Sequence, residues 1–333
     1  MVRKTNKKVK PLWKKLTIVL ATLIFITSSA LGIFFKTDVF ANQRDLWVQT
    51  AMNTSNHKWL ARSFLSENEI NTILAKYKVE NTSKSNSESV SLSTASPKIS
   101  TSSTDENNTS IKEISGSTYK GYVVTIKDPS TVKLVNTLTS SGGGTKLSDT
   151  VANNSYKVAL NAAGFDFDRA SESTGDQPLD SLTIIDGKLL YGDKETSYQM
   201  IGMTSEGKLV LGDYTYQEAI DAEIDDAISF GPYLLVNGEK QVTEKSTGGY
   251  QPRTAIGQAA DGTFFFVVIE GRSSSSVGAT LYDLQEIMEN LGAVNATNLD
   301  GGGSSEMYYD GELVNNLSNS KERELPNAFV VSK

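Results

Sequence analysis

The feature that most restricts the fold of this chain is an uncharged apolar run near its N-terminus. Residues 16–35 contain no charged side chain and are long enough to cross the roughly 30 Å hydrocarbon core of a bilayer as one helix. In lipid, a single segment satisfies all of its backbone hydrogen-bonding groups only as a helix. The run therefore predicts one transmembrane anchor, and every other element must be built outside it.

The flanking charges predict how this anchor is oriented. Residues 1–40 carry eight Lys or Arg residues against Asp38, whereas the whole chain has a net charge of −7. The positive-inside rule then places residues 1–15 as a basic tail in the cytoplasm. We expect a single-pass protein of the cell membrane whose C-terminal part is extracellular. A cleaved signal peptide is the alternative, because Val39-Phe40-Ala41 resembles a small-residue cleavage site.

Composition excludes several kinds of chemistry. The chain has no cysteine and one histidine, His57, so a disulfide framework, a thiolate metal site and a cysteine nucleophile are excluded. His57 lies far from the polar motifs of the C-terminal half, and we expect it to be a surface or packing residue. The part of the chain after the anchor is strongly acidic, so we expect no nucleic-acid partner.

The chain after the anchor divides into three parts by composition. Residues 41–78 read as a juxtamembrane helical segment, with a capping-box pattern at Ser66 and Glu69. Residues 79–110 are rich in Ser, Thr and Asn, with almost no apolar side chain to bury, and we expect a flexible linker. Residues 111–333 form the body.

The body contains a repeated signal for antiparallel hairpins. Dipeptides that end in glycine separate short apolar runs, and such dipeptides supply the positive φ that tight hairpins require. They are Asp186-Gly187, Glu206-Gly207, Asn237-Gly238, Asp261-Gly262 and Asp310-Gly311. A short helix is expected over residues 216–223, and a longer one starts at Thr280, has Asp283 at the capping-box spacing and ends at Gly292. We therefore expect an α+β, strand-rich single domain with one long buried helix.

Four clusters of polar residues are candidates for chemistry, although each also fits a cap, an ion pair or a turn. They are Asn161 with Asp166 and Asp168 after an apolar strand; Arg253 before an apolar run; Asp300-Gly301-Gly302-Gly303-Ser304; and Asn315 with Arg323 and Asn327.

The lack of histidine in the body narrows what these groups can do. Cleavage of a sugar C–O bond needs carboxylates around an oxocarbenium-like centre, and these are present. If the substrate carries a phosphate, arginine side chains and glycine N–H groups would bind it while a carboxylate works at the sugar carbon.

The order of these motifs resembles the phosphodiester glycosidase domain family over about residues 150–333. The motifs that carry the resemblance are Asn161…Gly164-Phe165, Arg253-Thr254-Ala255-Ile256-Gly257, Gly278-Ala279-Thr280, Asn298 to Ser305, Asp310-Gly311…Asn315 and Arg323…Asn327-Ala328. The resemblance implies an enzyme that hydrolyses the glycosidic bond of a sugar-1-phosphodiester. It also implies that Asn161, Arg253, Asp300 and Arg323 lie at the site.

Roles follow from residue type. We expect Asp300 to be the principal catalytic carboxylate and Arg253 and Arg323 to bind phosphate. The remaining candidates are Gly301, Gly302 and Gly303 as backbone donors, Ser304, Asn161 and Asn327 as orienting groups, and Asp166 and Asp168 as substrate-binding acids.

The expected substrate is a bacterial exopolysaccharide or a teichoic-acid-like surface glycan, with no cofactor required. One alternative is a non-catalytic module that binds anionic glycan through the same residues. Another is a calcium site built on Asp300 and neighbouring acids, because exported acidic proteins often hold calcium through oxygen ligands.

Overall fold

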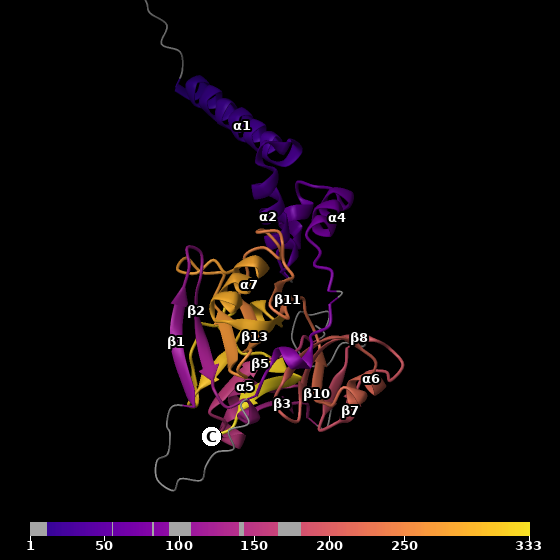
Figure 1. Ribbon diagram of the computed structural model, residues 1–333. Helices are drawn as coiled ribbons and strands as arrows, with labels where there is room; N and C mark the ends of the chain where they lie inside the picture. Colours follow the sequence, from indigo (N-terminus) through magenta and orange to yellow (C-terminus); the bar gives the residue numbers. More distant parts are fainter. Residues whose placement is uncertain (1–11, 55, 82, 93–107, 140–142, 166–180) are drawn as a thin grey trace, which may run out of the picture.

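Helix α1, Leu12–Lys36, stands away from the rest of the molecule in the computed structural model (Figure 1). The structure describes residues 12–333 except residues 55, 82, 93–107, 140–142 and 166–180. Between Lys15 and Lys36, α1 is long and apolar enough to cross a membrane. Its apolar side chains are exposed along most of its length.

A small helical unit connects α1 to the body (Figure 1). It consists of η1 Asp38–Phe40, α2 Ala41–Met52, α3 Lys58–Arg62 and α4 Glu67–Lys76. The predicted capping box is confirmed, because Ser66 Oγ accepts from Glu69 N and the Glu69 side chain accepts from Ser66 N. The unit has its own apolar core, in which the ring of Phe35 at the end of α1 stacks on Phe64 with centroids 4.5 Å apart.

The part of the expected linker that the structure describes is not a free linker. Residues 83–92, which include η2 Ser87–Ser89, run along the body. Ser85 N donates to Leu211 O at 2.7 Å, Leu211 N donates back to Ser85 Oγ at 2.8 Å, and Val90 is buried. Backbone hydrogen bonds to a strand edge hold these residues against the body, and the flexible linker stays a prediction for the remainder of residues 79–110. Residues 93–107 lie outside the described part of the chain.

A seven-stranded antiparallel sheet forms the centre of the body, with strand order β1-β2-β14-β13-β15-β11-β12. Its strands are β1 Thr109–Ser115, β2 Lys120–Ile126, β14 Phe264–Ile269, β13 Arg253–Ala259, β15 Ala293–Leu299, β11 Tyr233–Val236 and β12 Glu239–Lys240. Helix α7, Leu281–Asn290, packs its apolar side on one face of this sheet. The predicted cap of α7 is confirmed, with Thr280 Oγ1 accepting from Asp283 N.

Two five-stranded sheets lie against the other face. One has the order β7-β6-β10-β8-β9 and the other β17-β16-β5-β19-β3. The first contains β6 Thr183–Ile185, β7 Lys188–Tyr191, β8 Tyr198–Thr204, β9 Leu209–Tyr214 and β10 Ile224–Ser229, with α6 Tyr216–Asp221 beside it. The second contains β3 Val132–Asn136, β5 Val158–Asn161, β16 Met307–Tyr309, β17 Glu312–Leu313 and β19 Asn327–Val331. Smaller elements are η3 Pro129–Thr131, β4 Thr145–Lys146, α5 Leu147–Asn154, η4 Gly302–Ser304 and β18 Glu324–Leu325.

The five predicted hairpins are all present. They join β6 to β7, β8 to β9, β11 to β12, β13 to β14 and β16 to β17. Positive φ occurs where the dipeptides predicted it, for example at Asn237 and Gly238. The α+β class is therefore confirmed.

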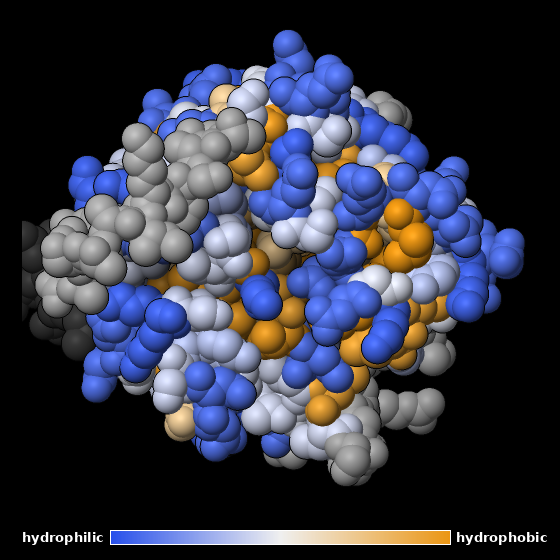
Figure 2. All heavy atoms as spheres, turned by 60° about the horizontal axis from the view of Figure 1, so that its bottom comes forward, coloured by the Kyte–Doolittle hydropathy of each residue, from blue (hydrophilic) through white to orange (hydrophobic). Residues whose placement is uncertain are grey.

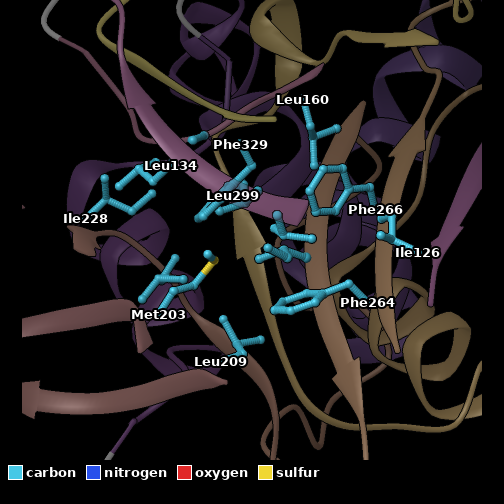
Figure 3. Packing of buried hydrophobic residues seen from close by; sticks show 14 of the residues in the cluster. Ile126, Leu134, Leu160, Met203, Leu209, Ile228, Phe264, Phe266, Leu299 and Phe329 are labelled. Atoms are coloured by element: carbon cyan, nitrogen blue, oxygen red, sulfur yellow. The ribbon is translucent and has the colours of Figure 1, made fainter. Parts of the chain in front are cut away.

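The three sheets share one apolar core. Leu160 and Phe329 come from the second five-stranded sheet, Phe264 and Phe266 from the central sheet, and Met203 from the first five-stranded sheet (Figure 3). The rings of Phe266 and Phe329 lie 6.3 Å apart between centroids. In contrast, hydrophilic residues cover most of the face of the body away from α1 (Figure 2), as is typical of a surface in contact with water.

Tyr233 makes the polar link between two of the sheets. Its side chain on β11 is fully buried, and its hydroxyl accepts from Gly212 N at 2.8 Å and lies 2.8 Å from Met200 O and 2.9 Å from Gly212 O. A phenylalanine would leave these strand groups of β8 and β9 without their partner.

We predict that Tyr233→Phe lowers the free energy of unfolding by about 1–3 kcal/mol, the usual cost of an unsatisfied buried polar group. Urea unfolding of the full chain measures the loss. Tyr282→Phe, at a half-buried position of α7, serves as the matched control and should stay within about 0.5 kcal/mol of the unmodified chain. Equal stability of the two variants would contradict the role given to the Tyr233 hydroxyl.

Candidate active site

A pocket of about 240 Å³ opens at the end of the central sheet nearest α2. Asp300 directly follows β15, and Arg253 begins the neighbouring strand β13; the pairing of Thr254 with Leu299 brings them to the same edge. Asn53, the C-cap of α2, also contributes to the wall. The lining residues are Asn53, Phe230, Gln251, Arg253, Arg272, Asn298, Leu299, Asp300, Gly301, Gly302, Gly303 and Arg323.

Arg253 is held rigidly by backbone carbonyls. Its Nε donates to Ala279 O at 3.1 Å, and its Nη2 donates to Gly248 O at 2.8 Å and Gly249 O at 2.9 Å. Burial and, to a smaller extent, the charge of Arg272 lower the pKa of Arg253 to about 10. The guanidinium therefore remains charged at neutral pH and has a fixed orientation.

Two further arginines line the same pocket. Arg272 donates from Nε and Nη2 to Gln251 Oε1, at 3.2 and 2.8 Å. Arg323 donates from Nη1 to Ser304 Oγ at 3.2 Å and lies over the ring of Phe165. Burial lowers the pKa of each arginine. Three cations in one small pocket form a strong site for an anion with several oxygens, such as a phosphate group.

Asp300 is the one carboxylate among the described residues that line this pocket. Burial raises its pKa from 3.8 to about 6, although a hydrogen bond with Ser304, the charge of Arg323 and a hydrogen bond from Gly301 N all act to lower it. The Gly301 N···Oδ1 distance is 3.0 Å. A carboxylate with this pKa is ionised at neutral pH but exchanges protons close to it.

Two of the three glycines, Gly302 and Gly303, make room for arginine side chains. A Cβ on Gly303 would lie 2.6 Å from Arg323 Cζ, and one on Gly302 would lie 3.0 Å from Arg272 Nη2. Gly302 also has a φ of +64°. The N–H of Gly301 is used by Asp300, and that of Gly302 donates to Pro252 O at 2.9 Å. The expected role of the glycines as phosphate donors stays a prediction, and the absence of a Cβ at Gly302 and Gly303 lets the two arginines approach the turn closely.

Asn161 and Asn327 are buried behind the pocket and position its backbone. Asn161 Nδ2 donates to Asp300 O at 2.6 Å, and its Oδ1 accepts from Thr254 Oγ1 at 2.8 Å and Glu306 N at 3.1 Å. Asn327 Oδ1 accepts from Ala163 N at 2.8 Å. The orienting role expected for both residues agrees with this geometry, whereas a direct contact of Asn161 with substrate does not. Asp166 and Asp168 lie outside the described residues.

Sequence reasoning missed three residues at or beside the site. Arg272 comes three residues after the end of strand β14, behind Glu270 and Gly271, and an arginine shortly after a strand was the only signal. Asn298 lines the pocket and donates to Gly231 O at 3.0 Å, while its Oδ1 has no partner among the described residues. Glu306 is buried beside Arg323, and burial raises its pKa well above the ordinary value.

No group of three or more His, Asp or Glu side chains in the described part of the chain could hold a metal ion. His57 lies at the N-terminus of α3, in the helical unit. The calcium site expected as an alternative stays a prediction, because Asp166 and Asp168 are not described.

The fold and the pocket together define an α+β protein with a cationic, carboxylate-containing site at the end of an antiparallel sheet. The sequence profile of the phosphodiester glycosidase family matches residues 154–332, more than half of the chain. The chain belongs to the phosphodiester glycosidase family.

Curated relatives come from bacteria and mammals. An SPbeta prophage-derived protein of Bacillus subtilis, YomE, is 32% identical over 213 residues, which cover 58% of this chain and 31% of the relative. The mouse N-acetylglucosamine-1-phosphodiester alpha-N-acetylglucosaminidase is 24% identical over 230 residues, covering 62% of this chain and 43% of the relative. The human enzyme of the same name is 31% identical over 130 residues, covering 34% of this chain and 25% of the relative. The chain thus spans less than half the length of each of these relatives.

A solved structure has the same fold. The zebrafish N-acetylglucosamine-1-phosphodiester alpha-N-acetylglucosaminidase catalytic domain, described as auto-inhibited by its pro-peptide, superposes with a TM-score of 0.55 at 22% sequence identity. The match covers 68% of this chain and 82% of the zebrafish domain. At this identity the similarity establishes the fold alone.

The raised pKa of Asp300 predicts a pH-dependent effect of Asp300→Asn on stability. A carboxyl whose folded pKa lies above its unfolded value destabilises the fold fully above the folded pKa, and not at all below the unfolded one. We predict that Asp300→Asn raises the free energy of unfolding by about 1–2 kcal/mol at pH 7.5 and that the gain disappears as pH falls from about 6 towards 4. Urea unfolding at both pH values measures it; a gain that is largest at pH 4 would contradict the assigned environment.

Proposed function

We propose that this chain is a membrane-anchored hydrolase that cleaves the glycosidic bond of sugar-1-phosphodiesters in extracellular glycan. The single observation that supports this most is the placement of one carboxylate with a raised pKa among three arginines, of which Arg253 is buried, Arg323 is half-buried and Arg272 is exposed. Membership of the phosphodiester glycosidase family supports the same reaction. The relatives act on N-acetylglucosamine-1-phosphodiesters by name, so N-acetylglucosamine is the sugar that we propose to test first.

In the proposed reaction, the arginines bind the phosphodiester and Asp300 works at C1 of the sugar. The C1–O bond breaks and its electron pair leaves on the phosphate oxygen. Water supplies a hydroxyl group to C1, and the proton of that water passes to the Asp300 carboxylate. The departing phosphate monoester is a weak base, so the positive charge of Arg253, Arg272 and Arg323 can stabilise it without a separate proton donor.

The position of the pocket supports a substrate close to the membrane. Asn53 caps α2 and also lines the pocket, and α2 is 12 residues long. At 1.5 Å per residue this helix spans about 18 Å. With α1 in the membrane and the body outside, the pocket would open towards the bilayer side of the body, where a surface polymer or a teichoic-acid-like chain is anchored.

Turnover of a simple phosphodiester tests the proposal. The full chain in detergent is incubated with UDP-N-acetylglucosamine and with the methyl diester of N-acetylglucosamine-1-phosphate, and free sugar is measured by NMR. We predict that Asp300→Asn lowers kcat by about a thousandfold or more and that Arg323→Gln lowers kcat/KM at least tenfold, about the effect of losing one charged contact in a transition state.

The matched control is Arg62→Gln, which removes an exposed arginine of α3 paired with Glu67 and should leave both constants unchanged. Tight binding of either diester without release of sugar would instead support the non-catalytic glycan-binding alternative. Turnover that disappears in a chelator would support the calcium alternative.

The pKa of Asp300 also predicts the pH profile of the reaction. Because the proposed mechanism uses the ionised carboxylate, kcat/KM should rise with pH through about 6 and then level off. The profile is measured on the methyl diester, whose phosphate stays singly charged over this range. A rate that falls as pH rises through 6 would mean that Asp300 acts as a proton donor and would overturn the role given to it.

A further inference from the structure

A second, larger cleft adjoins the candidate active site. It has a volume of about 940 Å³ and lies between the helical unit and the first five-stranded sheet, and Asn53 and Phe230 line both the cleft and the Asp300 pocket. One wall comes from α2 and the segment after α4, and the other from β8 and the residues that follow β10. A ligand in the pocket can therefore continue into the cleft.

The wall of this cleft is polar but carries little charge. Lys78 and Asp193 are the charged residues among those described in its lining, and the others are mainly amides, hydroxyls and rings. Tyr77, Tyr198 and Phe230 supply aromatic surface. Rings that bury area, together with a few fixed hydrogen-bonding groups, are typical of sites for organic ligands of several rings. A nucleic acid or an acidic peptide would need more positive charge than this wall provides.

Three amide atoms of the lining residues lack a protein partner. Gln49 Nε2, Asn81 Oδ1 and Gln199 Nε2 are buried and have no hydrogen-bond partner among the described residues. Gln49 is 2% exposed, and its Oε1 is already used by Gly248 N at 2.8 Å. These side chains come from both walls of the cleft, and each has hydrogen-bonding capacity that the described residues do not use. Amides donate and accept in adjacent positions, as sugar hydroxyls do.

We propose that this cleft, called here the glycan cleft, binds the uncharged saccharide chain of an extended glycan whose phosphodiester occupies the Asp300 pocket. The inference rests on the proposed function and deepens it, because it makes a polymer, rather than a single sugar phosphodiester, the substrate. A volume near 940 Å³ lies at the upper end of the range for sites that enclose drug-sized ligands, which is more than one sugar requires. Gln49 and Asn81 precede residue 154, where the family match begins, so one wall is a feature of this chain outside the matched region.

Binding of neutral oligosaccharides tests the glycan cleft without any need for turnover. The full chain carrying Asp300→Asn is titrated in detergent micelles with chitotetraose, cellotetraose and maltotetraose, and binding is measured by calorimetry and by saturation-transfer NMR. At least one of the three should bind. Binding of none of them overturns the proposal.

Variants on both walls locate the bound sugar. Gln199→Ala and Asn81→Ala, introduced separately, should each weaken the binding at least tenfold, while Gln217→Ala, an exposed glutamine of α6, should leave it unchanged. Thermal melting shows which variants remain folded, and the two walls supply independent variants if one is unstable. Unchanged binding in both folded wall variants would overturn the proposal.

The two proposals fail in different ways. Hydrolysis of the methyl diester without binding of any oligosaccharide would keep the proposed function and remove the glycan cleft. Oligosaccharide binding by the unmodified chain without hydrolysis of any diester would keep the cleft and remove the proposed function.

Discussion

The buried amide of Asn161 is the interaction on which the geometry of the pocket depends. It lies at the end of β5 and bonds to Asp300 O just after β15, to Thr254 Oγ1 of β13, and to Glu306 N, which follows the glycine turn formed by Gly301, Gly302 and Gly303. Two of the three bonds are buried and the one to Asp300 O is partly buried, so loss of the amide would remove the partner of three polar groups at once. Because two sheets and the glycine turn meet at this one side chain, the position of the candidate carboxylate is set by the core rather than by a surface loop.

The three arginine charges of the pocket repel one another, and the Asp300 carboxylate beside Arg323 offsets part of that repulsion. Arg253, Arg272 and Arg323 are partly or wholly removed from water, and neighbouring arginines lower the pKa of two of them. Backbone carbonyls and Gln251 offset part of this cost. A bound phosphodiester would relieve the remaining repulsion, which makes the empty pocket less favourable than the filled one. The anion binding that we propose would therefore offset a cost in stability that the arginines impose on the empty pocket.

Local signals in the sequence predicted the helices and hairpins well, but they predicted poorly which of these elements pack against one another. The hairpin dipeptides, the Ser66 and Thr280 caps and the apolar stripe of α7 are short-range patterns, and the structure contains each of them. No short-range pattern in the sequence predicted the contacts between segments that lie far apart along the chain. Arg272 joins the site only because β14 lies beside β13, and residues 83–92 are ordered only because an edge strand accepts their backbone. The glycine turn was located correctly, yet its role in admitting two guanidinium groups depends on neighbours that no local pattern specifies.

The attachment of α2 to the body affects how a substrate would reach the pocket. Gln49 and Thr50 bond to residues 248–251, and Gly248 and Gly249 in turn orient Arg253. With α1 embedded, a body attached this firmly cannot swing freely on a tether. The pocket would stay at a fixed height above the bilayer and would reach substrate only by lateral diffusion of the anchored protein. The rate of encounter would then depend on the surface density of the glycan and on how fast the anchor diffuses. Release of the body by cleavage before α2 would preserve the pocket and abolish that confinement.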